Sequence, residues 1–258
     1  MKVSIITVVL NNRDTIEDCM LSVFNQSYPD IEYIIIDGGS VDGTVDIIKK
    51  YESKIAKWVS EPDGGIYDAM NKGIKLASGD IIGILNSDDV YINDDVISEV
   101  VREFKNKDVD SIYGDLVYVR RDDLNKVVRY YNSGRFNRQR LSWGFMPAHP
   151  TLFVKRRIYD EFGLFKQEYK ISGDFELIAR IFGKGSISCS YINKPIIKMR
   201  TGGVSSSLRN KIKLNKEIYK ACKENGIRTN YVLLALRSIY KLSEPFPSKR
   251  LRKIKESE

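Results

Sequence analysis

The sequence predicts an α/β protein built on a mostly parallel β-sheet, of the Rossmann-like kind, with helices on its faces. Short apolar runs alternate with segments that have the period of an amphipathic helix, and this alternation is typical of βαβ units. The chain has 258 residues, of which 42% are hydrophobic and 29% are charged, so it can bury a core without disulfides. The counts of 18 glycines and 7 prolines exclude collagen-like and low-complexity chains.

Four apolar runs in the first half are expected to form parallel strands. The first run contains no charged residue, so we expect it to be buried on both faces. The other three are also mostly apolar, although the second contains Glu32 and the third contains Lys57. The four expected strands are Val3–Val9, Ile31–Ile36, Ile55–Val59 and Ile81–Leu85.

Helices are expected between these strands. The segment Asp14–Asn25 places its apolar residues, at positions 16, 19, 20 and 23, on one stripe. The turn Gly38–Ser40 leads toward a helix over Val45–Tyr51. Further helices are expected over Ile66–Ala77 and Val96–Phe104.

The second half is less regular and is expected to mix strands with helices. Ser111–Arg120 and Lys126–Tyr131 are predicted to form an antiparallel pair, followed by a polar, Arg-rich loop over Asn132–Phe145. The pattern predicts a body over residues 1–207, with halves 1–105 and 106–207, and a helical, basic C-terminal extension over residues 208–258. The remaining expected elements are helices over Lys155–Phe162, Asp174–Phe182, Leu208–Gly226 and Tyr231–Leu242, and strands over Ser186–Ile192 and Ile196–Met199.

The single histidine and the three cysteines exclude several chemistries. With only His149, a multi-histidine metal site is impossible and a Ser-His-Asp hydrolase is disfavoured. Cys19, Cys189 and Cys222 are an odd number at no metal-ligand spacing, which favours a reducing cytosol over a disulfide framework. The apolar run after Lys2 lacks a cleavage pattern, and no run approaches the roughly 20 apolar residues needed to span a bilayer. We therefore expect a cytoplasmic protein.

The net charge of +8 is concentrated in the C-terminal extension. Residues 208–258 hold 14 Lys and Arg against 5 Asp and Glu, a net charge of +9, so residues 1–207 carry −1. A basic extension with interspersed apolar residues is suited to an anionic membrane surface, which is the preferred hypothesis. The alternatives are a solvated end that packs one apolar face on the core, and binding to nucleic acid.

Polar residues follow each of the first four expected strands. Asn11 and Asn12 follow the first, Asp37 the second, Glu61–Gly65 the third and Asn86–Asp89 the fourth. In open α/β sheets, ligands bind beyond the carboxyl ends of the strands. Several polar and acidic loops on one rim therefore indicate a binding site.

Asp37 stands at the end of an expected buried strand, directly before the turn Gly38–Ser40. A carboxylate in this place can accept hydrogen bonds from a base or a ribose. The alternative is a tight turn in which Asp42 or Thr44 caps the next helix.

Asp88 and Asp89 are adjacent carboxylates after the strand Ile81–Leu85. They repel each other unless a positive charge lies between them, and Mg²⁺ typically uses one or two carboxylates together with substrate phosphates. A metal bound to a diphosphate also neutralises the charge of that leaving group. The alternative is that the segment only caps the following helix, a role that Asp94 or Asp95 could take instead.

Six segments carry a resemblance to a known family. They are Asp37-Gly38-Gly39-Ser40, Asp42-Gly43-Thr44, Glu61-Pro62-Asp63-Gly64-Gly65-Ile66-Tyr67-Asp68-Ala69-Met70-Asn71-Lys72-Gly73, Asn86-Ser87-Asp88-Asp89, His149-Pro150-Thr151 and Ser172-Gly173-Asp174-Phe175-Glu176-Leu177. Together they resemble the family-2 glycosyltransferases of GT-A fold, over residues 2–207. The subgroup that the sequence resembles assembles bacterial O-antigen, capsule or exopolysaccharide repeats. The resemblance implies a nucleotide-sugar-binding half followed by an acceptor half.

The resemblance also implies a UDP-sugar donor, and Mg²⁺ or Mn²⁺ as the cofactor. Asp37 would bind the uracil or the ribose. Asp88 and Asp89 would be the acids of the DXD-type metal motif, although Asn86 stands where many relatives carry the first acid. Met70 stands where many relatives have an arginine, so that cationic contact is missing or supplied elsewhere. The other implied donor contacts are Thr7, Asn11, Ser40, Asp63, Asn71 and Gly73, together with Asp88.

Asp174 matches the catalytic base of the family. Inversion at an anomeric carbon is a single displacement by an acceptor hydroxyl, so a carboxylate on the acceptor side has to take the proton. Glu176 is the alternative base, and apart from the family Asp174 could be a helix N-cap. The segment Arg200–Ser205 is expected either to close over the diphosphate or to be an ordinary connection. Residues implied on the acceptor or phosphate side are His149, Arg200, Gly203 and Ser205.

The sequence therefore predicts a metal-dependent inverting glycosyltransferase that moves a hexose, of the glucose or galactose type, from a UDP-sugar to a lipid-linked saccharide. The expected partners are this donor, a polyprenyl-diphosphate-linked or other saccharide acceptor, and the inner face of the cell membrane, but no nucleic acid. Another nucleotide-using Rossmann-like enzyme is one alternative, although no G-x-G-x-x-G or P-loop motif is present. A basic nucleic-acid-binding protein is the other, although the basic charge lies in the extension and the rim is acidic.

Overall fold

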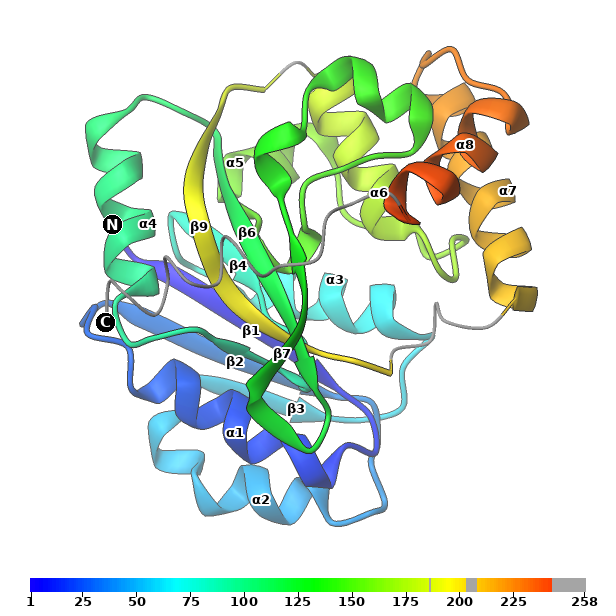
Figure 1. Cartoon of the computed structure of the whole chain (residues 1–258). Helices are drawn as coiled ribbons and strands as arrows, with labels where there is room; N and C mark the ends of the chain where they lie inside the picture. Colours follow the sequence, from blue (N-terminus) through cyan, green and yellow to red (C-terminus); the bar gives the residue numbers. More distant parts are fainter. Residues whose placement is uncertain (186, 203–207, 243–258) are drawn as a thin grey trace.

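The computed structural model describes residues 1–185, 187–202 and 208–242 (Figure 1). Its strands are β1 (Val3–Val9), β2 (Ile31–Asp37), β3 (Lys57–Ser60), β4 (Ile81–Ile84), β5 (Asp89–Tyr91), β6 (Ser111–Arg120), β7 (Asp123–Tyr131), β8 (Phe153–Lys155) and β9 (Cys189–Arg200). They form one nine-stranded sheet in the order β3-β2-β1-β4-β8-β6-β9-β5, and β7 pairs with β6. The predicted α/β class is confirmed.

The first four strands are parallel, as the alternation of strands and helices predicts. β1 pairs with β2 and β4, and β2 pairs with β3. Every residue of β1 is buried. Ile6 and Val8 pack in the core on one face of the sheet, and Ile5 and Val9 pack in the core on the other. Because the strands are parallel, their carboxyl ends and the polar loops that follow lie along one edge.

Helices cover both faces of the sheet. They are α1 (Arg13–Phe24), α2 (Thr44–Lys50), α3 (Ile66–Leu76), α4 (Val96–Asn106), α5 (Arg156–Phe162), α6 (Gly173–Ile178), α7 (Leu208–Glu224) and α8 (Tyr231–Leu242). α1, α2 and α4 contribute to one core, and α3 and α5 to α8 contribute to the other. Figure 1 shows α1 and α2 on one side of the sheet, and α3, α6, α7 and α8 on the opposite side.

Several elements of the second half differ from the sequence prediction. β5 and β8 were not expected; each has three residues and forms only by pairing with distant strands. The two short strands expected around residues 186–199 are one strand, β9, whose pairing with β6 shifts register near Pro195 because proline has no amide to donate. The predicted loop over 132–145 contains two 3₁₀ turns, and α6 continues into a π-helical turn over Ala179–Lys184.

The described part of the C-terminal extension shares the core of the body. Ile218, Ala221 and Cys222 of α7 and Leu234 of α8 are buried in the same cluster as α3 and α6. Within residues 1–185, 187–202 and 208–242, no helix combines the length and the apolar character that crossing a membrane requires.

Candidate active site

Side chains tie together the loops that follow β1, β2 and β4. The amide of Asn11 donates to the hydroxyl of Ser40 over 2.7 Å, and the amide of Val41 donates to Asn11 Oδ1 over 2.9 Å. The side-chain amide of Asn12 donates to Ser87 Oγ over 2.8 Å. Asn11 has a φ of 49°, a left-handed conformation that asparagine tolerates better than most residues. The three loops therefore form one connected rim at the carboxyl ends of the strands.

Asp37 is fully buried at the end of β2, and one of its carboxylate oxygens has no hydrogen-bond partner among the residues that the structure describes. Oδ2 accepts hydrogen bonds from the amides of Gly39 and Ser40 and from the hydroxyl of Ser60, at 3.1, 3.0 and 2.6 Å. Oδ1 has no hydrogen-bond partner within the described ranges. Leaving a buried acceptor unsatisfied is costly, so Oδ1 is suited to an N–H or O–H group of a ligand.

Ser60 is a residue of this site that sequence reasoning missed. It ends β3, and the parallel register of β2 and β3 places it opposite Asp37. A serine at the end of an expected strand is a weak signal by itself. Only the pairing of the two strands shows that its hydroxyl orients the Asp37 carboxylate.

Asp63 joins the loop after β3 to the turn that follows Asp37. A Cβ on Gly38 would lie 2.5 Å from Asp63 Oδ2, so a side chain at residue 38 would force the Asp63 carboxylate to shift. Asp63 Oδ1 accepts a hydrogen bond from the amide of Gly65 over 2.8 Å. Asp63 therefore lies on the rim, close to the turn that holds Asp37.

Three of the predicted donor contacts occupy packed positions. The buried Thr7 hydroxyl accepts a hydrogen bond from a tyrosine hydroxyl over 3.0 Å. The side-chain amide of Asn71 is bonded to the backbone of Phe165 in both directions, at 2.8 and 2.9 Å. A Cβ on Gly73 would lie 2.4 Å from Ile6 Cγ2, so this glycine lets α3 approach β1. These residues build the frame of the site, and a direct contact to a donor by any of them stays a prediction.

Asp88 and Asp89 differ in exposure. Asp88 is half-buried, whereas Asp89 is fully buried, and its Oδ2 accepts a hydrogen bond from the side-chain amide of Asn86 over 3.1 Å. The other oxygen, Oδ1, has no hydrogen-bond partner among the described residues. Burial, and next the charge of Asp88, raise the pKa of the Asp89 carboxyl well above its usual range. A cation at this pair would relieve both the repulsion and the missing contact.

The donor set at this pair fits a hard divalent cation. Mg²⁺ is commonly held by one or two carboxylates, with waters and substrate phosphates completing its shell. Within the described part of the chain, no cluster of three or more His, Cys, Asp or Glu side chains is arranged to hold a metal by itself. The two acids would therefore share an ion with a ligand rather than enclose it, and Asp88 is the more accessible of the two.

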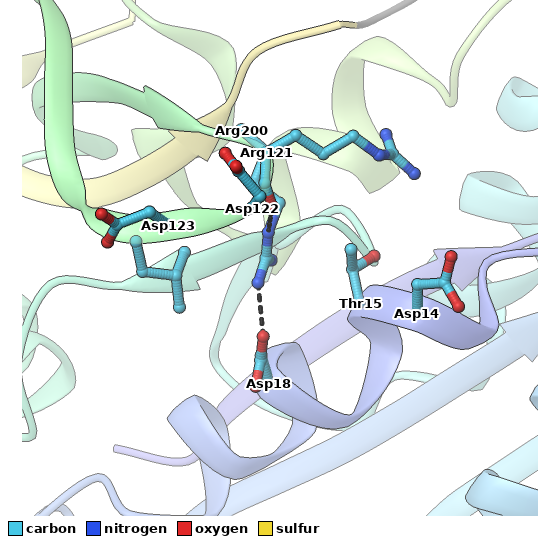
Figure 2. Close-up of a pocket in the computed structure, with 8 residues that line it drawn as sticks. Asp14, Thr15, Asp18, Arg121, Asp122, Asp123 and Arg200 are labelled. Atoms are coloured by element: carbon cyan, nitrogen blue, oxygen red, sulfur yellow. Dashed lines mark hydrogen bonds and ion pairs between the residues drawn. The ribbon is translucent and has the colours of Figure 1, made fainter.

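Arg200, at the end of β9, is buried, and each of its three guanidinium nitrogens has a partner. Its Nη1 donates to the carbonyl of Asp88 over 2.8 Å, its Nε donates to the carbonyl of Arg121 over 3.2 Å, and its Nη2 pairs with Asp18. In Figure 2 the guanidinium points down to Asp18 of α1, while the Arg121 side chain extends away from it. Arg200 thus braces the backbone beside the acid pair, and a contact to phosphate stays a prediction. Gly203 and Ser205 lie outside the described residues.

A polar cavity of about 590 Å³ adjoins Arg200. It lies between the first turns of α1, with Asp14, Thr15 and Asp18, and the tip of the β6–β7 hairpin, where the turn at 121–122 and the first two residues of β7 line it (Figure 2). The cavity adjoins the site through Arg200, which holds the carbonyl of Asp88, and through Thr15, whose hydroxyl donates to the carbonyl of Ser87 over 3.0 Å.

His149 and Asp174 meet in the structure. His149 Nδ1 lies 3.1 Å from Asp174 Oδ2, and their side chains are 32% and 16% exposed. Asp174 Oδ1 accepts a hydrogen bond from the amide of Phe175 over 2.8 Å. Each carboxylate oxygen can accept two hydrogen bonds, and the described residues supply one neighbour to each. The pair can be reached from solvent.

Glu176, the alternative base, is in a different environment. It is fully buried, and it forms ion pairs with Lys166 at 3.1 Å and with Arg180 at 2.9 Å. A carboxylate that is enclosed and paired in this way does not reach an acceptor. The geometry therefore favours Asp174 over Glu176.

Tyr67 is a second residue that sequence reasoning did not single out. Its hydroxyl accepts a hydrogen bond from the amide of Gly173 over 2.8 Å, across 106 residues of sequence. A Cβ on Gly173 would lie 2.8 Å from the Tyr67 ring, so residue 173 has to be glycine for this contact. Tyr67 belongs to the segment Glu61–Gly73 and therefore links that motif to the residue before Asp174. The motif was the available signal, but the contact depends on the tertiary fold.

A parallel half-sheet with an acidic rim, followed by a mixed half-sheet, defines a transferase of the GT-A fold, and comparisons with known proteins agree. A model described as glycosyl transferase family 2 matches residues 4–163. The chain belongs to glycosyltransferase family 2. This membership decides for a transferase against the two alternatives considered from the sequence.

Two relatives illustrate the match. The chain is 35% identical over 181 residues to an uncharacterized glycosyltransferase of Mycobacterium tuberculosis, covering 69% of this chain and 68% of that one. It is 26% identical over 213 residues to a PGL/p-HBAD biosynthesis glycosyltransferase of Mycobacterium bovis, covering 81% and 80%. Neither name refers to O-antigen or capsule assembly, so that part of the resemblance stays a prediction.

Solved structures show the same fold. TarS of S. aureus in complex with UDP-GlcNAc has a TM-score of 0.67 at 18% identity, with 86% of this chain and 66% of that one covered. The mannosyltransferase PcManGT of Pyrobaculum calidifontis in complex with GDP-Man and Mn²⁺ has a TM-score of 0.68 at 16% identity, with 99% and 79% covered. At these identities the likeness establishes the GT-A fold.

Proposed function

We propose that this protein is a metal-dependent inverting glycosyltransferase that moves a hexose, of the glucose or galactose type, from a UDP-sugar to a lipid-linked saccharide. The observation that carries the proposal is that the protein contains two half-sites. One is the rim, where Asp37 and Asp89 each have a buried carboxylate oxygen that no described residue contacts by a hydrogen bond. The other is the accessible His149–Asp174 pair. A transferase needs both a donor site and a base for the acceptor.

Asp37 is suited to fix the nucleoside. Three hydrogen bonds hold its Oδ2, so the carboxylate cannot rotate, and Oδ1 is left for an N–H or O–H group of the base or the ribose. The structural neighbour TarS was solved with UDP-GlcNAc, which supports a uridine nucleotide as the donor carrier.

Asp88 and Asp89 are suited to hold Mg²⁺ or Mn²⁺, which when bound neutralises negative charge on the diphosphate that leaves. The solved complex of PcManGT with GDP-Man and Mn²⁺ supports a divalent ion in this fold. Arg200 keeps the Asp88 backbone in place through its hydrogen bond to the Asp88 carbonyl.

Asp174 is proposed to be the general base. The acceptor hydroxyl forms a bond to the anomeric carbon as the bond from that carbon to the UDP oxygen breaks, and the hydroxyl proton passes to Asp174. His149 beside Asp174 Oδ2 keeps the carboxylate oriented. The configuration at the anomeric carbon inverts because the displacement occurs once.

The acceptor and the location are proposed from the sequence. The basic extension suits the anionic inner face of the cell membrane, where a lipid-linked saccharide would be presented. We therefore propose a cytoplasmic enzyme bound peripherally to the membrane and active in surface polysaccharide biosynthesis.

The first prediction concerns the base. Asp174→Asn is expected to abolish transfer, while the affinity for UDP in the presence of Mn²⁺ stays within about twofold of wild type, because the base acts on the acceptor. A screen of UDP-sugars, with UDP release as the readout, supplies the donor for this assay. Calorimetry with UDP measures the affinity.

Glu176→Gln is the matched comparison. It removes a buried, paired carboxylate, so we expect a loss of thermal stability without a specific loss of kcat. Normal turnover of Asp174→Asn, together with an inactive but folded Glu176→Gln, would show that the base is assigned to the wrong residue.

A further inference from the structure

A carboxylate on α7 holds the segment that leads to Asp174. Glu217 Oε2 accepts hydrogen bonds from the amides of Ile171 and Ser172, both at 2.9 Å, and from the Ser172 hydroxyl at 3.1 Å. The amide of Lys170 lies 3.2 Å from both oxygens of the same carboxylate. One side chain therefore binds three consecutive backbone amides.

These hydrogen bonds favour the ionised form of Glu217. Burial opposes the charge, but the amides of Ile171, Ser172 and Lys170 outweigh it and hold the pKa of the Glu217 carboxyl below its usual value. Hydrogen bonds to an ionised acceptor are stronger than those between neutral groups. The contact is therefore a strong constraint on residues 170–172.

The constraint continues into the residue next to Asp174. The amide of Gly173 donates to the Tyr67 hydroxyl over 2.8 Å. Two elements from distant parts of the chain, α3 and α7, thus fix four consecutive amides, from Lys170 to Gly173. Asp174 follows directly and meets His149.

The docking of α7 does not depend on Glu217 alone. Ile218 and Cys222 anchor the helix in the core. Glu224, near the end of α7, forms an ion pair with Lys166 at 2.7 Å and accepts a hydrogen bond from the Tyr169 hydroxyl at 3.0 Å. Because other contacts secure the helix, the four hydrogen bonds of Glu217 serve chiefly to define the backbone at 170–172.

We propose that Glu217 is a positioning residue for the transfer reaction, which fixes the backbone before Asp174 so that this carboxylate stays beside His149. The inference rests on the proposed function, since it takes Asp174 as the base. It assigns a role in the reaction to α7, which lies beyond the residues 4–163 that match the family model.

Hydrogen exchange tests the constraint without any substrate. In the full-length chain, Glu217→Gln is expected to speed amide exchange at residues 170–172 by about tenfold or more, because an amide oxygen is a weaker acceptor than a carboxylate. Glu224→Gln is the matched control on the same helix. It removes a carboxylate that contacts side chains only, and we expect it to change exchange at 170–172 by less than about twofold.

Kinetics test the consequence for the reaction. Glu217→Gln is expected to lower kcat by about tenfold or more, with the donor KM and the affinity for UDP and Mn²⁺ unchanged within about twofold. Glu224→Gln is expected to keep the wild-type kcat. Ser172→Ala, which removes only the hydroxyl contact, should shift kcat and exchange in the same direction by about twofold to threefold, and it serves if Glu217→Gln fails to fold.

The outcomes separate this inference from the function on which it rests. The inference is overturned if Glu217→Gln and Glu224→Gln show the same amide exchange at residues 170–172 and the same kcat. If Glu217→Gln does not fold, the inference is overturned when Ser172→Ala shows the exchange and the kcat of the wild type. The inference is also overturned if Glu217→Gln raises the donor KM and weakens UDP binding together with the loss of kcat, because the substitution would then disturb the donor site as well as Asp174. If Asp174→Asn turns over normally, the base assignment fails, whatever the exchange data for Glu217→Gln show.

Discussion

At the scale of single residues, the buried carboxylates of Asp37 and Asp89 differ in how the protein holds them. Asp37 has one oxygen with three donors, which fixes its orientation, and a second oxygen to which no residue in the described ranges donates. Asp89 has one weakly held oxygen and a like-charged neighbour. The first arrangement suits a neutral donor group such as an N–H, and the second suits a cation.

The acid pair gives a prediction about metal binding. Asp88→Asn and Asp89→Asn are each expected to reduce transfer by more than about a hundredfold, and to abolish the rise in melting temperature that Mn²⁺ with UDP gives the wild type. In chelator, Asp89→Asn is expected to be at least as stable as wild type, because it removes a buried charge that has a like-charged neighbour.

Asp94→Asn is the matched control for the acid pair. Asp94 is an exposed acid in the loop before α4, and we expect the variant to keep activity and its response to metal. Full turnover of the wild type in excess chelator would contradict a metal requirement, and a response to Mn²⁺ that survives in Asp88→Asn and in Asp89→Asn would move the metal to other residues.

Residues of this site could be predicted where a strand end marks them, and not where a tertiary contact does. Asp37 and the pair Asp88 and Asp89 stand at the ends of strongly apolar runs, so the parallel sheet places them on one rim. Ser60 and Glu217 carry no such local mark. Their roles come from a strand register and from a helix that follows in sequence, both of which appear only when the chain is folded.

At the scale of elements, one buried carboxylate fastens the amino ends of the strands, opposite the site. Glu32 of β2 accepts hydrogen bonds from the Ser4 hydroxyl at 2.6 Å and from the amide and hydroxyl of Ser78, both at 2.7 Å. Lys2 and Lys57 each lie 3.2 Å from its Oε1. Glu32 thereby joins β1, β2, β3 and the loop that leads from α3 to β4.

Glu32→Gln is expected to lower the free energy of unfolding by about 2–4 kcal/mol at pH 7. The substitution removes a buried negative charge and with it the ion pairs to Lys2 and Lys57. Burial opposes the charge of Glu32, but the hydrogen bonds from Ser4 and Ser78 outweigh it and hold the pKa of the carboxyl well below its usual value. Such a group stabilises the fold above its unfolded pKa, near 4.5, and this contribution is lost as the pH falls toward the folded pKa.

Denaturant unfolding at several pH values measures this effect. The difference between wild type and Glu32→Gln should be constant above about pH 5.5 and should shrink below about pH 4. Glu161→Gln, at an exposed position of α5, should stay within about 0.5 kcal/mol of wild type. A difference that does not change with pH would mean that shape, rather than charge, accounts for the loss.

The elements that could be predicted are those with a long local pattern. β1, β2 and β4 are apolar runs between polar turns, and α1 and α3 carry a clear apolar stripe. β5 and β8 have three residues each, which is too short for a hydrophobic period to be detected in the sequence. β5 forms because it pairs with β9, and β8 forms because it pairs with β4 and β6. The π-helical continuation of α6 likewise has no local signature in the sequence.

At the scale of the whole molecule, the basic charge is concentrated at the C-terminal end, where α8 also exposes apolar side chains. The extension carries +9 against −1 for the rest of the chain. α8 presents Tyr231, Val232 and Leu236 to solvent, with 54%, 68% and 40% of each residue exposed. Large exposed apolar side chains next to basic sequence are the ingredients of an interfacial helix. The same helix contributes Leu234 to the core, so it is fastened to the enzyme while one face stays open.

Deleting residues 245–258 is therefore expected to weaken binding to anionic vesicles and to spare transfer to a short, soluble acceptor. Five basic residues lie between Lys249 and Lys255, and at about 1 kcal/mol each near an anionic leaflet they could supply several kcal/mol of attraction. Binding of the wild type should fall as salt rises, because the Debye length shrinks from roughly 10 Å at 0.1 M to 3 Å at 1 M.

Replacing the five basic residues between Lys249 and Lys255 by glutamine keeps the length of the chain and should weaken vesicle binding as much as the deletion does, since charge is the proposed cause. The residual binding of both variants should depend less steeply on salt than that of the wild type, because fewer basic residues remain, and it should decrease further in Val232→Ser, which removes an exposed apolar side chain of α8. Vesicle binding that ignores the deletion, the glutamine variant and salt alike would show that the extension does not act at the membrane.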